Sequence, residues 1–333
     1  MRGNLLGHFS AVLAAMLATA SLTPTASAAT TSASTVKRGN GIVRFVAPSD
    51  RSIHLTVSVD SAGLITFREP NGPIDPGRGC ARVTSHLVTC GPNKGRVVVR
   101  ATPFDDFVGV PSQIRGGTLV DGAAGNDLFV GGPGRETLRG GLGNDDLRGQ
   151  AGNDVLAGGE GDDALLGEDG ADTLFGGDGN DVIQGAAGND TIDEGTPSTE
   201  SENGADEISG GSGLDTVSYA ERHTAVNVSA NDIPDDGRVN EGDDVHSDIE
   251  DIIGGPSDDE IIGDELDNRL LGGDGNDVLV GGRGKDVVLG MRGDDTLDTE
   301  DGKVDRAVCG DGNDTANVDI KDHVSACETV NAS

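Results

Sequence analysis

Residues 122–193 read GAAGNDLFV GGPGRETLR GGLGNDDLR GQAGNDVLA GGEGDDALL GEDGADTLF GGDGNDVIQ GAAGNDTID, eight nine-residue units in direct succession. Each unit has Gly at its first and fourth positions, an acid at the sixth and a large apolar residue at the eighth. The eighth positions are Phe129, Leu138, Leu147, Leu156, Leu165, Leu174, Ile183 and Ile192. Five further units at 254–298 place Ile261, Leu270, Leu279, Val288 and Leu297 there. This fixed period indicates a packed repeat rather than a disordered Gly- and Asp-rich tract.

The chemistry of one unit predicts a turn followed by a short strand. Its Gly-rich first six residues can adopt the positive backbone angles of a tight turn, and its last three alternate around one inward apolar side chain. Two units then form one coil, so residues 18 apart stack on one side. Stacked strands lie about 4.8 Å apart, and calcium takes oxygen ligands at about 2.3 to 2.6 Å. A cation between two stacked turns therefore reaches the acids of both.

The units resemble the hemolysin-type calcium-binding repeat, also called the RTX nonapeptide, Gly-Gly-x-Gly-x-Asp-x-U-x. The resemblance implies an all-β fold, a parallel β-roll, in which position-six carboxylates and turn carbonyls hold calcium. The ligands it implies in the first block are Asp127, Asp145, Asp154, Asp163, Asp172, Asp181 and Asp190. Glu136 departs from the pattern, because its extra methylene would displace the carboxylate. Magnesium wants shorter bonds in a stricter octahedron, so a carbonyl-rich cage should prefer calcium.

The repeat also predicts ligands outside the first block. The register breaks at 196–198 and returns around two secondary candidates, while the second block has Asn268 at one sixth position. The additional predicted ligands are Asp206, Asp215, Asp259, Asp277, Asp286, Asp295 and Asp314. Units two apart leave six gaps in the first block and three in the second, so we expect up to about nine calcium ions.

The remaining segments give the domain organisation. Arg2, an apolar run over 9–18 and Ala26-Ser27-Ala28 are typical of a secretory signal at 1–28. We therefore expect an exported, extracellular protein without a membrane span once the signal is removed. Residues 29–115 hold short β-branched runs at 42–46, 53–59, 64–67, 81–83, 87–90 and 97–99. They predict either a small separate β-sandwich or coils that cap the first edge of the solenoid.

We divide the rest of the chain into a first β-roll block at 116–218, an insertion of wider coils at 219–253, a second block at 254–298 and a C-terminal cap at 299–333. The four cysteines allow three pairings. Cys80 with Cys90 and Cys309 with Cys327 each close a short loop within one segment, which favours these disulfides in an oxidising compartment. No paired C-x-x-C or nearby His spacing supports zinc instead.

The net charge of the chain restricts the kinds of partner that it can bind. Residues 29–115 carry 11 Lys and Arg against 6 Asp and Glu, a net of +5, whereas 116–333 carry 12 against 52, a net of −40. Such an acidic repeat region makes binding to nucleic acid or to an anionic membrane unfavourable. Its simplest uses are solubility and the capture of cations.

The sequence offers no catalytic residues. It has no H-E-x-x-H and no G-x-S-x-G motif, and the repeat accounts for every strong carboxylate pair. Position seven, read along the first block, shows no threonine row of the kind expected for an ice- or surface-binding array. We expect a secreted protein that folds on binding calcium and has a structural, adhesive or interaction role, with a cell-surface or extracellular polymer partner. The alternative is a carbohydrate-active or other hydrolytic enzyme with calcium-stabilised repeats.

Overall fold

The computed structural model describes residues 33–39, 42–77, 80–92, 95–194, 204–238 and 241–333. The predicted signal peptide at 1–28 lies outside these residues. The described chain is all-β, with a parallel β-solenoid of about 12 turns and a small antiparallel N-terminal region, which confirms the predicted fold class. No helix among the described residues is long and apolar enough to cross a membrane.

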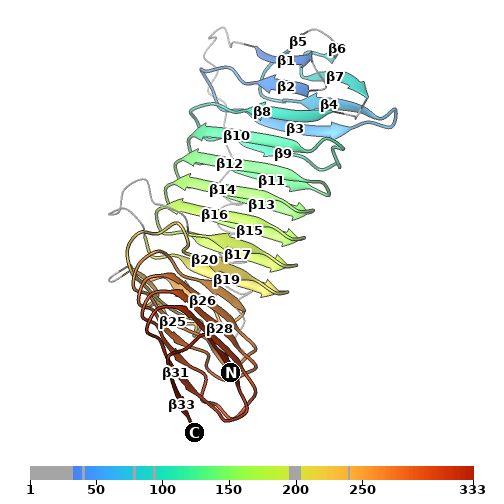
Figure 1. The fold of residues 1–333 in the computed structure, drawn as a ribbon. Helices are drawn as coiled ribbons and strands as arrows, with labels where there is room; N and C mark the ends of the chain where they lie inside the picture. The colour runs from blue at the N-terminus through green and yellow to red at the C-terminus, as the bar shows by residue number, and fades with distance from the viewer. Residues whose placement is uncertain (1–32, 40–41, 78–79, 93–94, 195–203, 239–240) are drawn as a thin grey trace. The chain divides into compact units, whose positions relative to one another are not determined.

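Each nonapeptide unit contributes one strand, and successive strands alternate between two sheets (Figure 1). The long sheet contains β10 (Thr118–Ala124), β12 (Glu136–Leu142), β14 (Val155–Glu160), β16 (Thr173–Asp178), β18 (Thr191–Asp193) and β20 (Thr216–Ser218). The second sheet contains β9 (Phe107–Gly109), β11 (Leu128–Gly132), β13 (Asp146–Ala151), β15 (Ala164–Asp169), β17 (Val182–Ala187) and β19 (Glu207–Ser212). Neighbours are parallel, and within the uninterrupted units they are shifted by 18 residues, as in Leu147 opposite Leu165.

The core of the roll is the stack of eighth-position side chains. All thirteen are at most 1% exposed, because each points inward while the residues on either side of it point to the other face of the strand. A positive φ at most fourth-position glycines, such as 126° at Gly161, turns the chain from one sheet to the other. The predicted alternation of turn and strand is confirmed, but many strands are longer than predicted and include the first three residues of the next unit, as β13 does.

The insertion at 219–253 changes one face of the roll and leaves the other continuous. The long sheet runs on through β24 (Asp251–Ile253), β26 (Arg269–Asp274), β28 (Val287–Arg292), β30 (Arg306–Asp311) and β32 (His323–Ser325). The second sheet ends at β23 (Asp244–Val245), and a third sheet takes its place. This third sheet contains β21 (Val226–Ser229), β22 (Gly237–Arg238), β25 (Glu260–Ile262), β27 (Val278–Val280), β29 (Thr296–Asp298), β31 (Thr315–Val318) and β33 (Thr329–Ala332).

The N-terminal region extends the long and second sheets. Its strands are β1 (Ser34–Gly39), β2 (Ile42–Val46), β3 (His54–Val59), β4 (Leu64–Arg68), β5 (Ile74–Pro76), β6 (Cys80–Thr84), β7 (Leu87–Pro92) and β8 (Arg96–Arg100). Strand β8 runs parallel beside β10 and is followed by β2, and β9 runs parallel beside β11 and is followed by β3. Beyond them the pairing becomes antiparallel through β4, β7 and β6. Phe45 and Phe67 stack in this core with their ring centroids 6.1 Å apart.

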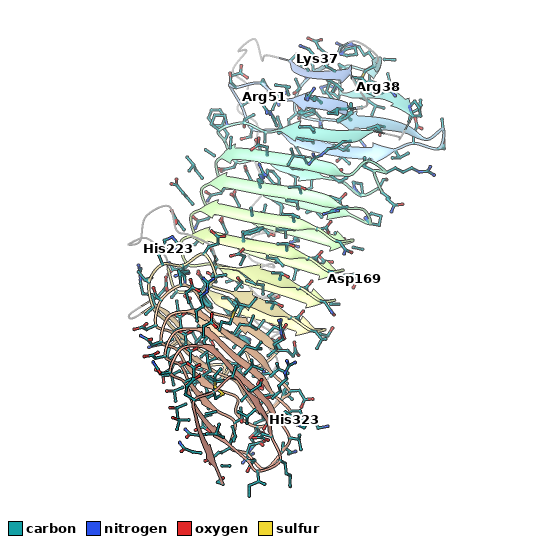
Figure 2. The ribbon with its side chains drawn as sticks, in the orientation of Figure 1. Lys37, Arg38, Arg51, Asp169, His223 and His323 are labelled. Atoms are coloured by element: carbon teal, nitrogen blue, oxygen red, sulfur yellow. A yellow bond between two sulfur atoms is a disulfide. The ribbon has the colours of Figure 1, made fainter. Side chains whose placement is uncertain are left out.

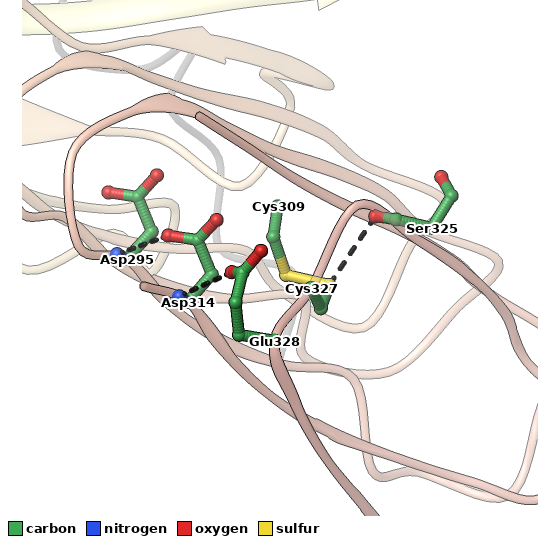
Figure 3. The surroundings of a disulfide bond; sticks show 6 residues. All are labelled: Asp295, Cys309, Asp314, Ser325, Cys327 and Glu328. Carbon is green, nitrogen blue, oxygen red and sulfur yellow. Dashed lines mark hydrogen bonds between the residues drawn. A yellow bond between two sulfur atoms is a disulfide. The ribbon is translucent and has the colours of Figure 1, made fainter. Parts of the chain in front are cut away.

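Both predicted disulfides are present. Cys80 and Cys90 join β6 to β7, and Cys309 and Cys327 join the last repeat unit to the C-terminal segment. Figure 3 shows the second bridge, with Cys327 Sγ beside the carbonyl oxygen of Ser325. The described cysteines leave no free thiol.

Candidate metal-binding turns

The position-six acids form a hydrogen-bonded ladder at the start of the strands of the second sheet. The backbone N–H of Asp127 donates to Oδ1 of Asp145 at 2.7 Å, Asp145 donates in the same way to Asp163, and Asp163 to Asp181 at 2.8 Å. The ladder continues from Asp181 to Asp206 at 2.7 Å. One carboxylate oxygen of each acid therefore joins its coil to the preceding one.

Matching ladders precede the strands of the long and third sheets. In the long sheet Glu136, Asp154, Asp172, Asp190 and Asp215 follow one another, each N–H donating to the next carboxylate at 2.7 or 2.8 Å. In the third sheet the same bonds join Asp259, Asp277, Asp295 and Asp314 at 2.8 to 2.9 Å. Asn268 and Asp286 form a further step in the long sheet at 2.9 Å. The register thus brings the predicted ligands together in stacked turns.

The second carboxylate oxygen has no hydrogen-bond donor among the described residues at most of these positions, although it is buried. These oxygens are Oδ2 of Asp127, Asp145, Asp154, Asp163, Asp172, Asp181, Asp190, Asp206, Asp215, Asp277, Asp286, Asp295 and Asp314. Turn carbonyl oxygens converge on the same places. A Cβ added to Gly149 would lie 2.6 Å from Asp154 Oδ2 and 2.7 Å from the carbonyl oxygen of Gly167. Unpaired anionic oxygens and carbonyl oxygens around a space that only glycine leaves open are the donor set calcium prefers.

Burial also shifts the acid equilibria of these groups. Loss of solvent raises the pKa of Asp127 and Asp163 to about 8, and the stacked carboxylates add to this effect. The same cause raises the pKa of Asp154 and Asp277 to about 7. Ionised carboxylates are thus costly in this environment unless a cation offsets their charge.

Three predicted positions differ from the rest. Glu136 is fully buried, and its Oε2 accepts from the N–H of Gly132 at 3.2 Å. Asn268 presents a buried Nδ2, a donor, where the other turns present an unpaired oxygen. Asp259 uses both oxygens, accepting from the N–H of Val226 at 2.9 Å and that of Gly255 at 2.6 Å. Of these, only Glu136 keeps an unpaired oxygen, Oε1.

The sequence pattern missed acids that extend the ladders. The N–H of Asp106 donates to Asp127, Asp206 donates to Asp243, and Asp215 to Glu250. At the other end Asp286 donates to Asp305, and Asp314 to Glu328 (Figure 3). The spacing from Asp206 to Asp243 is 37 residues, and that from Asp286 to Asp305 is 19, so neither fits an 18-residue period. A search that allowed insertions between units could have found Asp305.

Charge is distributed unevenly over the described chain. Lys37, Arg38 and Arg51 lie in the N-terminal region, and Asp169 lies on the roll (Figure 2). Arg51 pairs with the buried Glu69 at 2.7 Å, which offsets one acid of this region. The acids of the ladders have no comparable partner in most turns, so the excess negative charge is concentrated where the unpaired oxygens lie.

The fold and these turns define a calcium-binding parallel β-roll. The family model of the RTX calcium-binding nonapeptide repeat (4 copies) matches residues 119–138, 130–165, 166–193, 201–219, 247–278 and 262–297. The chain therefore carries RTX hemolysin-type calcium-binding repeats, and the resemblance inferred from the sequence is confirmed. A search of curated proteins gives no significant match.

Proposed function

We propose that this chain is an extracellular protein whose β-roll folds when its acidic turns bind calcium, and that its role is structural, adhesive or interaction-mediating rather than catalytic. The observation that carries the proposal is the row of buried carboxylate oxygens without a donor. Such a row costs free energy in every coil unless a cation occupies the turns, so it supports a fold that depends on calcium.

The repeat residues explain why folding would be coupled to binding. Residues 116–333 carry a net charge of −40, which opposes their compaction. Each Gly-rich turn loses much backbone entropy on ordering, while each unit buries only one large apolar side chain. When bound, calcium supplies two positive charges to oxygens from neighbouring coils, and binding free energy becomes folding free energy.

Two features support a location outside the cell. Both disulfides belong to segments at the ends of the roll, and such bonds persist in oxidising compartments. Extracellular calcium modules bind with dissociation constants of about 10⁻⁴ to 10⁻³ M, a range that would leave the repeats unfolded in the cytosol. Residues 1–28 would then serve as the export signal.

A non-catalytic role rests on how the acids are used. The strong carboxylate pairs lie in ladders in which one oxygen accepts a backbone N–H, as between Asp145 and Asp163. A general acid and base must instead be free to exchange protons with a substrate. We therefore assign these pairs to cation binding and coil stacking.

The test compares two adjacent acids of one turn. Asp163 is buried with a free Oδ2, whereas Asp162 is exposed and accepts from the N–H of Asn180 at 3.0 Å. Asp163→Asn and Asp162→Asn remove the same charge with little change of shape. We expect Asp163→Asn to raise the calcium midpoint of folding roughly tenfold, because charged ligands set calcium affinity, and Asp162→Asn to change it little.

The measurement is far-UV circular dichroism during a calcium titration from a chelated start, with magnesium as the control. A gain of β signal with calcium and not with magnesium is the expected result. A wild-type spectrum already fully β in chelator, or equal midpoints for the two variants, would contradict the proposal.

A further inference from the structure

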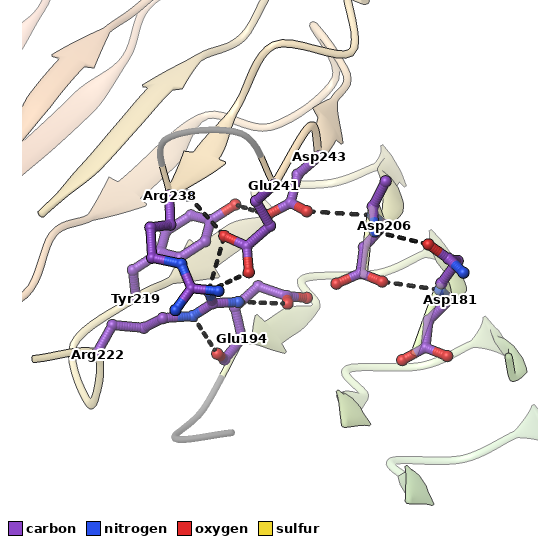
Figure 4. A network of polar contacts seen from close by, with 10 residues as sticks. Asp181, Glu194, Asp206, Tyr219, Arg222, Arg238, Glu241 and Asp243 are labelled. Atoms are coloured by element: carbon purple, nitrogen blue, oxygen red, sulfur yellow. Dashed lines mark hydrogen bonds and ion pairs between the residues drawn. The ribbon is translucent and has the colours of Figure 1, made fainter. Parts of the chain in front are cut away.

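A second group of buried acids lies where the insertion joins the roll, and it does not follow the repeat. Glu194, Asp206 and Asp243 are 5%, 2% and 0% exposed, and one oxygen of each lies within 4.8 Å of the others (Figure 4). Asp206 belongs to a repeat turn, whereas Glu194 and Asp243 lie outside the residues that the family model matches. We call these three residues the junction site.

Glu194 takes a place that the repeat reserves for glycine. It follows Asp193, the last residue of the unit at 185–193, so it stands at the first position of the next turn, which Gly158 holds within β14 and Gly176 within β16. In regular turns a Cβ at that position would collide with the carboxylate of the same turn, as Gly158 would with Asp163. The side chain of Glu194 enters this space, so its carboxylate joins those of Asp206 and Asp243 where a regular turn has only a glycine.

Two oxygens of the junction site point at each other without a donor. Neither Glu194 Oε1 nor Asp206 Oδ2 receives a hydrogen bond from any described residue. The remaining oxygens are held in place: Asp206 Oδ1 accepts from the N–H of Asp181 at 2.7 Å, and Asp243 Oδ1 accepts from that of Asp206 at 3.1 Å. Facing, unpaired and immobilised acceptors form a preorganised cation site.

The surrounding basic groups do not neutralise this cluster. The Arg222 side chain is 2% exposed and donates to Glu241 at 2.8 and 2.9 Å and to Glu194 at 3.3 Å. Arg238 lies beside Glu241 (Figure 4). Glu241 and the three acids of the junction site make four carboxylates beside these two guanidinium groups, so the acids outnumber the bases. A divalent cation would offset this excess.

We propose that Glu194, Asp206 and Asp243 bind one divalent cation, calcium by the all-oxygen character of the donors, and that this ion fastens the insertion to the last coil of the second sheet. The site goes beyond the proposed function, because it is built from the insertion rather than from stacked nonapeptides. It fixes the point at which the second sheet ends, since Asp243 directly precedes β23, the last strand of that sheet.

The chain contains its own reporter for this site. Tyr219 is the only tyrosine, the chain has no tryptophan, and the Tyr219 hydroxyl donates to Asp243 Oδ2 at 3.5 Å. Terbium(III) replaces calcium at oxygen sites and luminesces when a nearby aromatic ring passes energy to it. Excitation that tyrosine absorbs and phenylalanine does not should therefore report terbium at the junction site.

The experiment titrates the folded mature chain with terbium and follows tyrosine-sensitised emission, with calcium as the competitor. We expect Glu194→Gln and Asp243→Asn to lower the terbium affinity at least tenfold while the calcium-induced gain of β signal persists. Asp181→Asn, which changes the adjacent repeat turn, should retain the emission. Glu241→Gln, which breaks an ion pair of Arg222 without removing a ligand, should retain it as well.

Emission that survives Glu194→Gln and disappears with Asp181→Asn would place the ion in the repeat turn and overturn the proposal. Anomalous scattering from wild-type crystals grown with terbium provides a check that needs no variant. A peak among the three carboxylates supports the site, and its absence overturns it. Failure of the repeats to fold with calcium would refute the proposed function alone, because the emission and the scattering peak are measured independently of that transition.

Discussion

Two adjacent residues of one turn, Gly185 and Ala186, should respond in opposite directions when each is changed into the other. Gly185 stands at position one, and a Cβ there would lie 2.7 Å from Cβ and 2.8 Å from Cγ of Asp190. Ala186 stands at position two with φ of 81°, in the left-handed region that disfavours alanine. The turn therefore requires glycine at the first of these positions, and it also favours glycine at the second.

The magnitudes follow from these two causes. Gly185→Ala inserts a methyl group against a buried acid, and overpacking of this kind costs about 1 to 3 kcal/mol. Ala186→Gly removes the strain of alanine in a left-handed conformation, about 1 to 2 kcal/mol. Ordering the more flexible glycine costs about 0.5 to 1 kcal/mol in entropy and offsets part of this gain. We expect Gly185→Ala to destabilise the roll by about 2 kcal/mol and Ala186→Gly to stabilise it by about 0.5 kcal/mol.

The assay is urea unfolding in saturating calcium, followed by far-UV circular dichroism, together with a calcium titration of each variant. A loss of about 1 to 3 kcal/mol corresponds to a shift of about 5- to 150-fold in an equilibrium midpoint, so the titration should resolve it. The double variant, which exchanges the two residues and keeps the composition, should remain less stable than the wild type. Equal effects of the two single changes would refute the assignment of turn positions.

Three further predictions address the core, the acids and the C-terminal bridge. Leu156→Ala should lower the free energy of unfolding by about 2 to 5 kcal/mol because the side chain is fully buried. Val155→Ala, at its half-buried neighbour, should lower it far less. Urea unfolding measures both, and equal losses would contradict the inward register. In chelator, the circular-dichroism signal of β structure should increase as pH falls from about 8 to 4. Burial raises the pKa of acids such as Asp163 to about 8, so the folded state favours their neutral form. A loss of this signal over the same range would contradict the predicted direction of the pH dependence. Replacing Cys309 and Cys327 by serine should lower stability by about 3 kcal/mol and speed hydrogen exchange in the last coils first, whereas uniform exchange along the roll would contradict a local role.

The core of the roll was predictable because its period is constant. Every eighth-position residue, from Phe129 to Leu297, is buried as predicted, since an uninterrupted 18-residue coil leaves no freedom of register. The β-branched run at 42–46 coincides with β2. Strands β5 and β9, each of three residues, gave no comparable pattern, because their pairing partners rather than their composition place them.

The ladder acids were predictable only within the uninterrupted units. Asp243 reaches Asp206 across 37 residues, and backbone pairing of β19 with β23 brings the two together. A sequence period cannot contain that information, because the length of the insertion rather than the repeat sets the spacing. The same limit applies to Glu194, because no fixed sequence spacing relates it to its partners in the junction site.

Position seven shows how a linear reading can mislead. Along the sequence it has no threonine row, but alternate units share a sheet, so the residues that lie side by side are two units apart. The long sheet aligns Thr137, Val155, Thr173, Thr191 and Thr216 in successive strands. The row is interrupted by Val155 and ends at Asp251. Reading position seven along the chain therefore overlooked the partial threonine row on the face of the long sheet.

In three turns, called closed turns below, the residue at position six accepts a hydrogen bond from the N–H at position two of the same turn, and of the three only Glu136 keeps an oxygen without a donor. The pairs are Gly132 with Glu136, Gly255 with Asp259 and Asp264 with Asn268, at 3.2, 2.6 and 2.8 Å. None of these position-two residues has the positive φ found at Gly141, Gly159 or Ala186 in open turns. The closed turns therefore differ from the open ones at two positions, because Gly134, Ser257 and Leu266 at position four also lack the positive φ of the open turns.

Proline at position three explains two of the closed turns. Pro133 and Pro256 follow Gly132 and Gly255 directly, and a proline ring favours an extended conformation with negative φ at the residue before it. The preceding N–H then points at the acid, so Asp259 has both oxygens paired although its acid occupies the correct position. In these two turns the proline at position three, which the repeat pattern leaves unspecified, thus accounts for the bond between the position-two N–H and the acid, whereas the turn at 263–271 closes with Glu265 at that position. The occupied sites should accordingly be fewer than the nine gaps between units, with Asp259 contributing no side-chain oxygen.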